Sequence, residues 1–191
     1  LELSAPQLAA AAEFCSGLGN VEFAEGSATA MPFGDGEFDA LSSIQTYEYV
    51  ADVDAALAEA RRVLKPGAKA AIISVLWDHW RFSGPDRALN DEIHEVWRAH
   101  CHHQMLPFEM HRRLSDNGFG GVVQKPIAFI NTSLHENAFA LWASRTLAFF
   151  GKSHGMDEKD VDTWLAQLED ANREGRMGFT SVPVLTVATA V

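Results

Sequence analysis

Two short segments, nearly continuous in apolar and small residues and separated by one helix, constrain the fold of this chain most. Residues 38–44 (FDALSSI) and 68–76 (AKAAIISVL) contain few polar positions, which is typical of strands covered on both faces. Between them Asp52 is suited to cap a helix, an apolar stripe recurs at helical spacing over 53–64, and residues 65–67 (KPG) end it. This strand–helix–strand order with short connections predicts parallel strands joined by a right-handed crossover.

The remaining segments extend the same pattern. Ser4 is placed to cap a first helix with Gln7 as its capping-box partner, so residues 1–3 fit the carboxyl end of an earlier strand. We further expect strands at 21–24, 121–131 and 179–191, and helices at 86–104, 108–117, 135–150 and 157–173. The sequence therefore predicts one α/β domain over residues 1–191: a doubly wound, mostly parallel sheet with helices on both faces and an antiparallel last strand.

Composition narrows the partners. The formal net charge of −11 argues against nucleic acid, because phosphate binding requires a basic face. Two cysteines do not form a disulfide framework, and no run of about 18 uncharged apolar residues predicts insertion into a membrane. We expect a cytoplasmic protein, with a homodimer left open.

Four motifs in order carry a family resemblance: Glu2-Leu3-Ser4, then NVEFAEGSATAMPF, FDALSSIQTYEYV and RRVLKPGAKAAIIS. Together they resemble the class I S-adenosylmethionine-dependent methyltransferases. The resemblance is closest to the small-molecule branch typified by the ubiquinone and menaquinone biosynthesis enzymes. It covers residues 1 to about 80 strongly, and it implies a methyltransferase that uses S-adenosylmethionine as cofactor.

The resemblance also implies the cofactor-binding residues. Glu2 would accept hydrogen bonds from the ribose hydroxyls, with Leu3 beside it. Ser27 stands where the family usually has an aspartate for the adenine amino group, so one charge-assisted contact is lost, which weakens binding by roughly 1 kcal/mol. Ala28 would donate its backbone amide, and Met31 would lie near the adenine. After the strand at 38–44, the family pattern places three further residues beside the methionine part of the cofactor: Ser43, Ile44 and Gln45.

Candidates for the chemistry follow two strand ends. Methyl transfer is an in-line displacement, for which a protein supplies alignment, desolvation and sometimes a base. Asp78 and His79 are candidates for that base, and Tyr47 could orient the acceptor or be a buried core residue. We expect the segments 81–117 and 132–175 to cover the acceptor site. Their aromatic residues, with Trp77 and Trp80, indicate a small, fairly hydrophobic acceptor, although the same residues could form core.

Residues 94–111 are rich in histidine, which raises the question of a metal site. His100 and His103 share a helical face, but no ligand set at a standard zinc spacing is present. We expect structural or surface roles and no metal, with acceptor binding as the alternative.

The glycine-rich motif that follows the first strand in this family does not occur in these residues. One interpretation is that they are part of a longer methyltransferase. The alternative is a degenerate, non-catalytic binding or assembly module. A nucleotide-dependent oxidoreductase is a weaker alternative, because GSATAMPF and RRVLKPGAK are not typical of one.

Overall fold

The computed structural model describes residues 1–191, and their contacts form two compact units. Unit 1 contains Leu1–Ser74, Phe108–Gln124 and Leu185–Val191, and unit 2 contains Val75–Pro107 and Lys125–Val184. Each unit therefore draws on several separate stretches of the chain. No helix in either unit combines the length and the apolar character needed to cross a bilayer.

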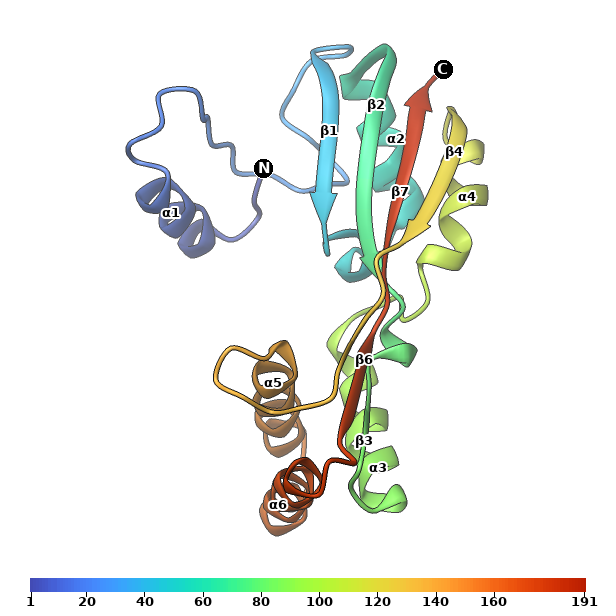
Figure 1. The fold of residues 1–191 in the computed structure, drawn as a ribbon. Helices are drawn as coiled ribbons and strands as arrows, with labels where there is room; N and C mark the ends of the chain where they lie inside the picture. The colour runs from blue at the N-terminus through green and yellow to red at the C-terminus, as the bar shows by residue number, and fades with distance from the viewer. The chain divides into compact units, whose positions relative to one another are not determined.

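The sheet of unit 1 has the strand order β1-β2-β7-β4. Its strands are β1 (Phe38–Ile44), β2 (Leu64–Val75), β7 (Pro183–Ala190) and β4 (Phe119–Pro126). β1 and β2 are parallel, as the sequence predicts, with Ile44 opposite Ile73. Figure 1 shows β7 running in the opposite direction to its neighbours. The α/β class with an antiparallel last strand is confirmed.

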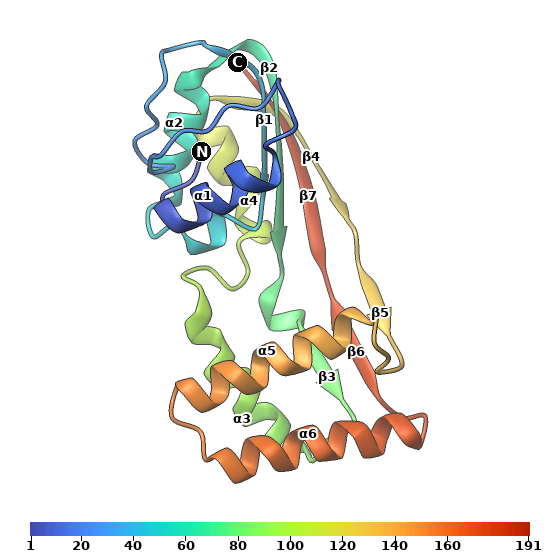
Figure 2. The same ribbon diagram turned by 90° about the vertical axis from the view of Figure 1, so that its left-hand side faces the viewer.

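Helices α2 (Val53–Val63) and α4 (Pro107–Asp116) lie together on one face of this sheet (Figures 1 and 2). The predicted cap forms, because the Asp52 carboxylate accepts a hydrogen bond from the Ala55 amide at 2.9 Å. The apolar stripe of α2 is buried, and on the sheet side every second residue of β2 and β7 is buried too. On the other face of the sheet, residues such as Ile73 and Val187 are only half-buried.

The start of the chain differs from the prediction. Helix α1 spans Ala5–Phe14, but the Ser4 side chain makes no cap, and instead its amide donates to Glu2 Oε1 at 2.8 Å. The strand expected at 21–24 is also wrong: the extended segment there makes one parallel bridge, between Glu2 and Glu25. The amide of Glu2 donates to the Ala24 carbonyl at 3.0 Å, which joins the two segments without extending the main sheet.

Unit 2 is built on a three-stranded antiparallel sheet of order β3-β6-β5. The strands are β3 (Arg81–Ser83), β6 (Gly178–Ser181) and β5 (Phe129–Asn131), and the helices are α3 (Arg87–Trp97), α5 (Phe139–Ser153) and α6 (Glu158–Arg173). Short 3-10 turns are η1 (Tyr47–Tyr49) in unit 1, and η2 (Trp77–His79) and η3 (Arg98–His100) in unit 2. Trp80, Trp164 and Phe179 are fully buried at the centre of this unit.

The edge strand β3 is sealed by two side chains of α3. Phe82 pairs with Phe179 of β6, and its own amide donates to His94 Nε2 at 3.1 Å. Its carbonyl accepts from Asn90 Nδ2 at 2.8 Å, and Asn90 Oδ1 in turn accepts from Trp164 Nε1 at 3.0 Å. The helix thus satisfies the backbone groups that an edge strand would otherwise leave open.

Two strands predicted as continuous are each divided in the structure. The segment expected at 121–131 forms β4 and β5, and the segment expected at 179–191 forms β6 and β7, each half in a different sheet. Pro126 ends β4 and Pro183 begins β7. A proline has no amide for the ladder, so the breaks fall where pairing is weakest.

Candidate cofactor cleft

Unit 1 contains a cleft of about 520 Å³ beside β1. Its walls come from the segment before α1, the extended segment at 22–28, the loop at 31–37, strand β1 and the turn that follows it. The lining residues that matter below are Leu1, Ala28, Met31, Phe33, Ser43, Ile44, Thr46 and Tyr47. The walls are mainly apolar, and the volume lies within the usual range for small-molecule sites, roughly 300 to 1,000 Å³.

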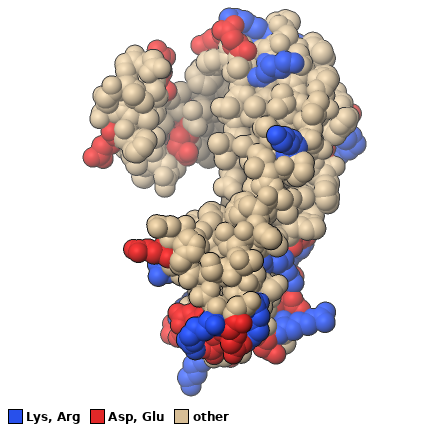
Figure 3. Space-filling model, viewed as in Figure 1, with Lys and Arg blue, Asp and Glu red and all other residues tan.

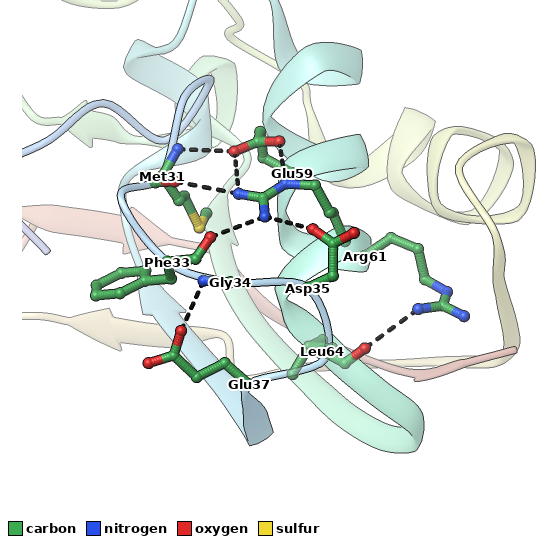
Figure 4. Close-up of polar contacts among 9 residues, drawn as sticks. Met31, Phe33, Gly34, Asp35, Glu37, Glu59, Arg61 and Leu64 are labelled. Carbon is green, nitrogen blue, oxygen red and sulfur yellow. Dashed lines mark hydrogen bonds and ion pairs between the residues drawn. The ribbon is translucent and has the colours of Figure 1, made fainter.

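The loop at 31–35 is held by two side chains of helix α2, Glu59 and Arg62, which also pair with each other. Figure 4 shows the Glu59 carboxylate beside the backbone of Met31. Arg62 Nε lies 2.7 Å from Glu59 Oε1, and its other nitrogens donate to the carbonyls of Met31 at 3.1 Å and Phe33 at 2.8 Å. Glu59 Oε2 accepts from the Met31 amide at 2.7 Å. The loop backbone is therefore fixed by side chains of the helix.

Glu59 and Arg62 each shift the pKa of the other. The hydrogen bond from Arg62, helped by the Met31 amide, lowers the pKa of Glu59 to about 2. The hydrogen bonds to Glu59 and Asp35 raise the pKa of Arg62 above its ordinary value. The side chains of Arg62 and Glu59 are 32% and 21% exposed, whereas Asp35 is 82% exposed. Both charges of the pair therefore persist at neutral pH, and the exposed Asp35 adds little.

The carboxyl end of β1 forms another part of the cleft. Ser43 and Ile44, two of the predicted cofactor residues, line it together with Thr46. Gln45 does not line it; its backbone adopts a left-handed φ of 52° while its amide donates to the Ile73 carbonyl at 2.8 Å. It is the one residue other than glycine with positive φ, and such strain concentrates at functional sites.

Tyr47 also lines the cleft and is almost wholly buried. Burial raises the pKa of its phenol above the ordinary value. The phenol is therefore protonated at neutral pH, so it can donate a hydrogen bond but cannot serve as a base.

The other predicted cofactor residues divide into two groups. Ala28 and Met31 line the cleft, whereas Glu2, Leu3 and Ser27 are not among its lining residues. One oxygen of Glu2 accepts from the Ser4 amide. The Ser27 hydroxyl is occupied within its own turn, 2.8 Å from Thr29 Oγ1 and 3.2 Å from the Thr29 amide.

The two candidate bases belong to unit 2. Asp78 forms an ion pair with Arg98, and both line a polar cavity of about 210 Å³. His79 is exposed, and its carbonyl accepts from Thr180 Oγ1 at 2.9 Å. Neither residue lines the cleft of unit 1.

The histidines of residues 94–111 have different environments. His94 is 4% exposed, and burial, aided by nearby Arg81, lowers its pKa to about 3. His100 stacks on Trp97 with ring centroids 4.0 Å apart, and burial lowers its pKa as well. His94 therefore has a structural role, sealing β3.

Unit 2 also presents an aromatic ledge, which we define as Phe129, Phe139 and Trp142. The Phe139 ring centroid lies 5.5 Å from that of Phe129 and 5.1 Å from that of Trp142. Phe139 and Trp142 both contact buried Trp80, and Trp142 is 57% exposed. Charged side chains crowd over α6, whereas the surface over α5 has few (Figure 3).

Sequence reasoning missed the Glu59–Arg62 pair. Its spacing of three residues on a helix was a signal for a local ion pair. Nothing in the spacing indicated that both side chains reach a loop 27 residues or more away.

Open α/β sheets bind their ligands in such a cleft, beyond the carboxyl end of a strand. The family model described as "Methyltransferase domain" matches residues 1–72, which include β1, α2 and most of the cleft wall. The Rhizobium johnstonii protein named ubiquinone/menaquinone biosynthesis C-methyltransferase UbiE is 38% identical over 79 residues, covering 41% of this chain and 28% of that protein. The chain thus matches less than a third of that relative's length. The family model and this relative confirm the resemblance drawn from the motifs.

Solved structures show the same fold across nearly the whole chain. The [4+2]-cyclase SpnF matches with a TM-score of 0.59 and 23% identity, over 98% of this chain and 63% of that one. A Haemonchus contortus phosphoethanolamine N-methyltransferase in complex with S-adenosylhomocysteine matches with a TM-score of 0.57 and 14% identity, over 99% of this chain and 42% of that one. A cyclase and a methyltransferase share this fold, so the fold alone does not define the reaction.

Proposed function

We propose that this protein transfers a methyl group from S-adenosylmethionine to a small, fairly hydrophobic molecule by in-line displacement. The observation that carries the proposal is the cleft at the carboxyl end of β1, which lies within the residues that match the methyltransferase domain family. Ligands of open α/β sheets bind at such strand ends.

The residues of the cleft fit this cofactor. The side chains of Met31 and Phe33 form an apolar wall suited to a planar base, and the Ala28 backbone can serve the edge of that base. Ser43 and Ile44, at the carboxyl end of β1, would border the methionine part. When bound, the cofactor supplies a methyl group on a positively charged sulfur.

The chain's own contribution would be alignment and exclusion of water. Tyr47, protonated and buried, can donate a hydrogen bond that orients an acceptor or the cofactor. Asp78 and His79 stay candidates for a base. The Asp78 carboxylate is engaged by Arg98, and His79 is solvent-accessible, so His79 is the better of the two.

We assign acceptor binding to the aromatic ledge of unit 2. Phe139 and Trp142 belong to the segment 132–175, which with 81–117 the sequence indicated as a cover, and Phe129 lies just before that segment. Its exposed rings rest on a buried tryptophan and offer a preformed apolar surface. A cytoplasmic location, and a homodimer if the protein self-associates, complete the proposal.

Binding of S-adenosylhomocysteine, measured by isothermal titration calorimetry, tests the cofactor. Ala28→Phe would fill the cleft and should abolish binding, whereas Ala9→Phe on the exposed surface of α1 is the matched control. Transfer of radiolabelled methyl groups to quinone-like and phenolic acceptors then tests the reaction. Binding without transfer to any acceptor would favour the non-catalytic module, and the absence of binding would refute the proposal.

A further inference from the structure

We propose that the Glu59–Arg62 pair is a positioning device that sets the wall of the cleft and thereby the affinity for the cofactor. The inference rests on the proposed function, and it assigns a role to two residues of α2 that do not line the cleft themselves.

All three guanidinium nitrogens of Arg62 donate hydrogen bonds. Its Nε and Nη2 donate to the two oxygens of Glu59 at 2.7 and 2.9 Å, which is a bidentate pair. Nη2 also donates to the Met31 carbonyl, and Nη1 donates to the Phe33 carbonyl and to Asp35. A planar fork with five donors can make this set of bonds, and a lysine cannot.

The backbone of Met31 is held on both sides. Its amide donates to Glu59 and its carbonyl accepts from Arg62. With both groups turned to the helix, the side chain lines the cleft. Phe33 is held by its carbonyl in the same way, and its ring packs edge-on against Phe38 at 4.9 Å.

The stability of helix α2 does not explain why the Glu59–Arg62 pair is present. Helix α2 has its own Asp52 cap and a fully buried apolar stripe, so it does not depend on the pair. Loss of the pair releases the loop instead. A loop that must be ordered again on binding reduces affinity, roughly tenfold for two immobilised side chains.

The neighbouring residue provides a matched control. Arg61 lies on the same helix, but its Nε donates to the Val191 carbonyl at 2.9 Å and its Nη1 to the Leu64 carbonyl at 3.2 Å. These contacts connect α2 to strand ends and do not reach the loop. Replacing Arg61 thus removes the same kind of side chain without releasing the cleft wall.

The test compares Arg62→Gln, Arg62→Lys and Glu59→Gln with Arg61→Gln, well below the melting temperature of each. We expect the first three to raise the dissociation constant for S-adenosylhomocysteine about tenfold, with turnover at saturating cofactor retained, and Arg61→Gln to leave it unchanged. Asp35→Asn should also have little effect. An unchanged affinity of Arg62→Gln for S-adenosylhomocysteine, or an equal loss of affinity in Arg62→Gln and Arg61→Gln, would overturn the inference.

A second readout does not depend on the cofactor. Hydrogen exchange of the Met31 amide in the free protein should be slow in the wild type and in Arg61→Gln, and fast in Arg62→Gln. If the three proteins show this pattern but the wild type does not bind S-adenosylhomocysteine, the proposed function fails while the positioning of the loop stands. Fast exchange in the wild type would refute the positioning itself.

Discussion

Replacing Asn90 by alanine should destabilise unit 2 strongly, because one side chain satisfies two buried groups. The change removes the bonds to the Phe82 carbonyl and to Trp164 Nε1, at 2.8 and 3.0 Å. Each group left unpaired in the core costs about 1–3 kcal/mol. We therefore expect a loss of about 3 kcal/mol in the free energy of unfolding.

Urea denaturation followed by circular dichroism measures this loss, with an unchanged slope as the condition for comparing midpoints. Asn137, which is exposed in the same unit, gives the control: Asn137→Ala should change stability by less than about 0.5 kcal/mol. In a double-mutant cycle, Trp164→Phe should be less costly in the Asn90→Ala background, by about 1 kcal/mol. A loss below about 1 kcal/mol for Asn90→Ala would show that β3 does not need this side chain.

Three further predictions concern other positions. Because His94 stays neutral in the folded protein down to a pKa of about 3, the unfolded chain binds one more proton below about pH 6.5. The free energy of unfolding should therefore decrease as the pH is lowered below about 6.5, by up to roughly 1.4 kcal/mol per pH unit. His94→Gln should make this pH dependence weaker in urea midpoints measured from about pH 4 to 7. Asp52→Ala should cost about 1 kcal/mol through the lost cap of α2, by the same assay. Gln45→Gly should raise the melting temperature by relieving the left-handed backbone, whereas Gln45→Val should lower it.

The local patterns of the sequence predicted the central elements well. β1 has the predicted bounds, and α2 has the predicted cap and buried stripe, because both depend on residues close together in the chain. The motifs likewise led to the cleft through Ala28, Met31 and the end of β1. These signals depend mainly on residues close together in the chain.

Signals of the other kind failed for a common reason. The strands at 121–131 and 179–191 each have one apolar pattern, but which sheet each half joins is decided by distant partners. Ser4 is an exception, because its signal is local: its side chain makes no cap, and its own amide donates to Glu2 Oε1. The reach of Arg62 to Met31 is equally a property of the folded chain, which spacing does not reveal.

The division of residues 178–190 into β6 and β7 has a consequence for assembly. β6 is the only partner of both β3 and β5, and β7 stands between β2 and β4. A ribosome delivers this stretch after β1 to β5. Neither sheet can close until it emerges, so nascent chains up to that point expose unpaired strands from both units and depend on one late segment to complete them.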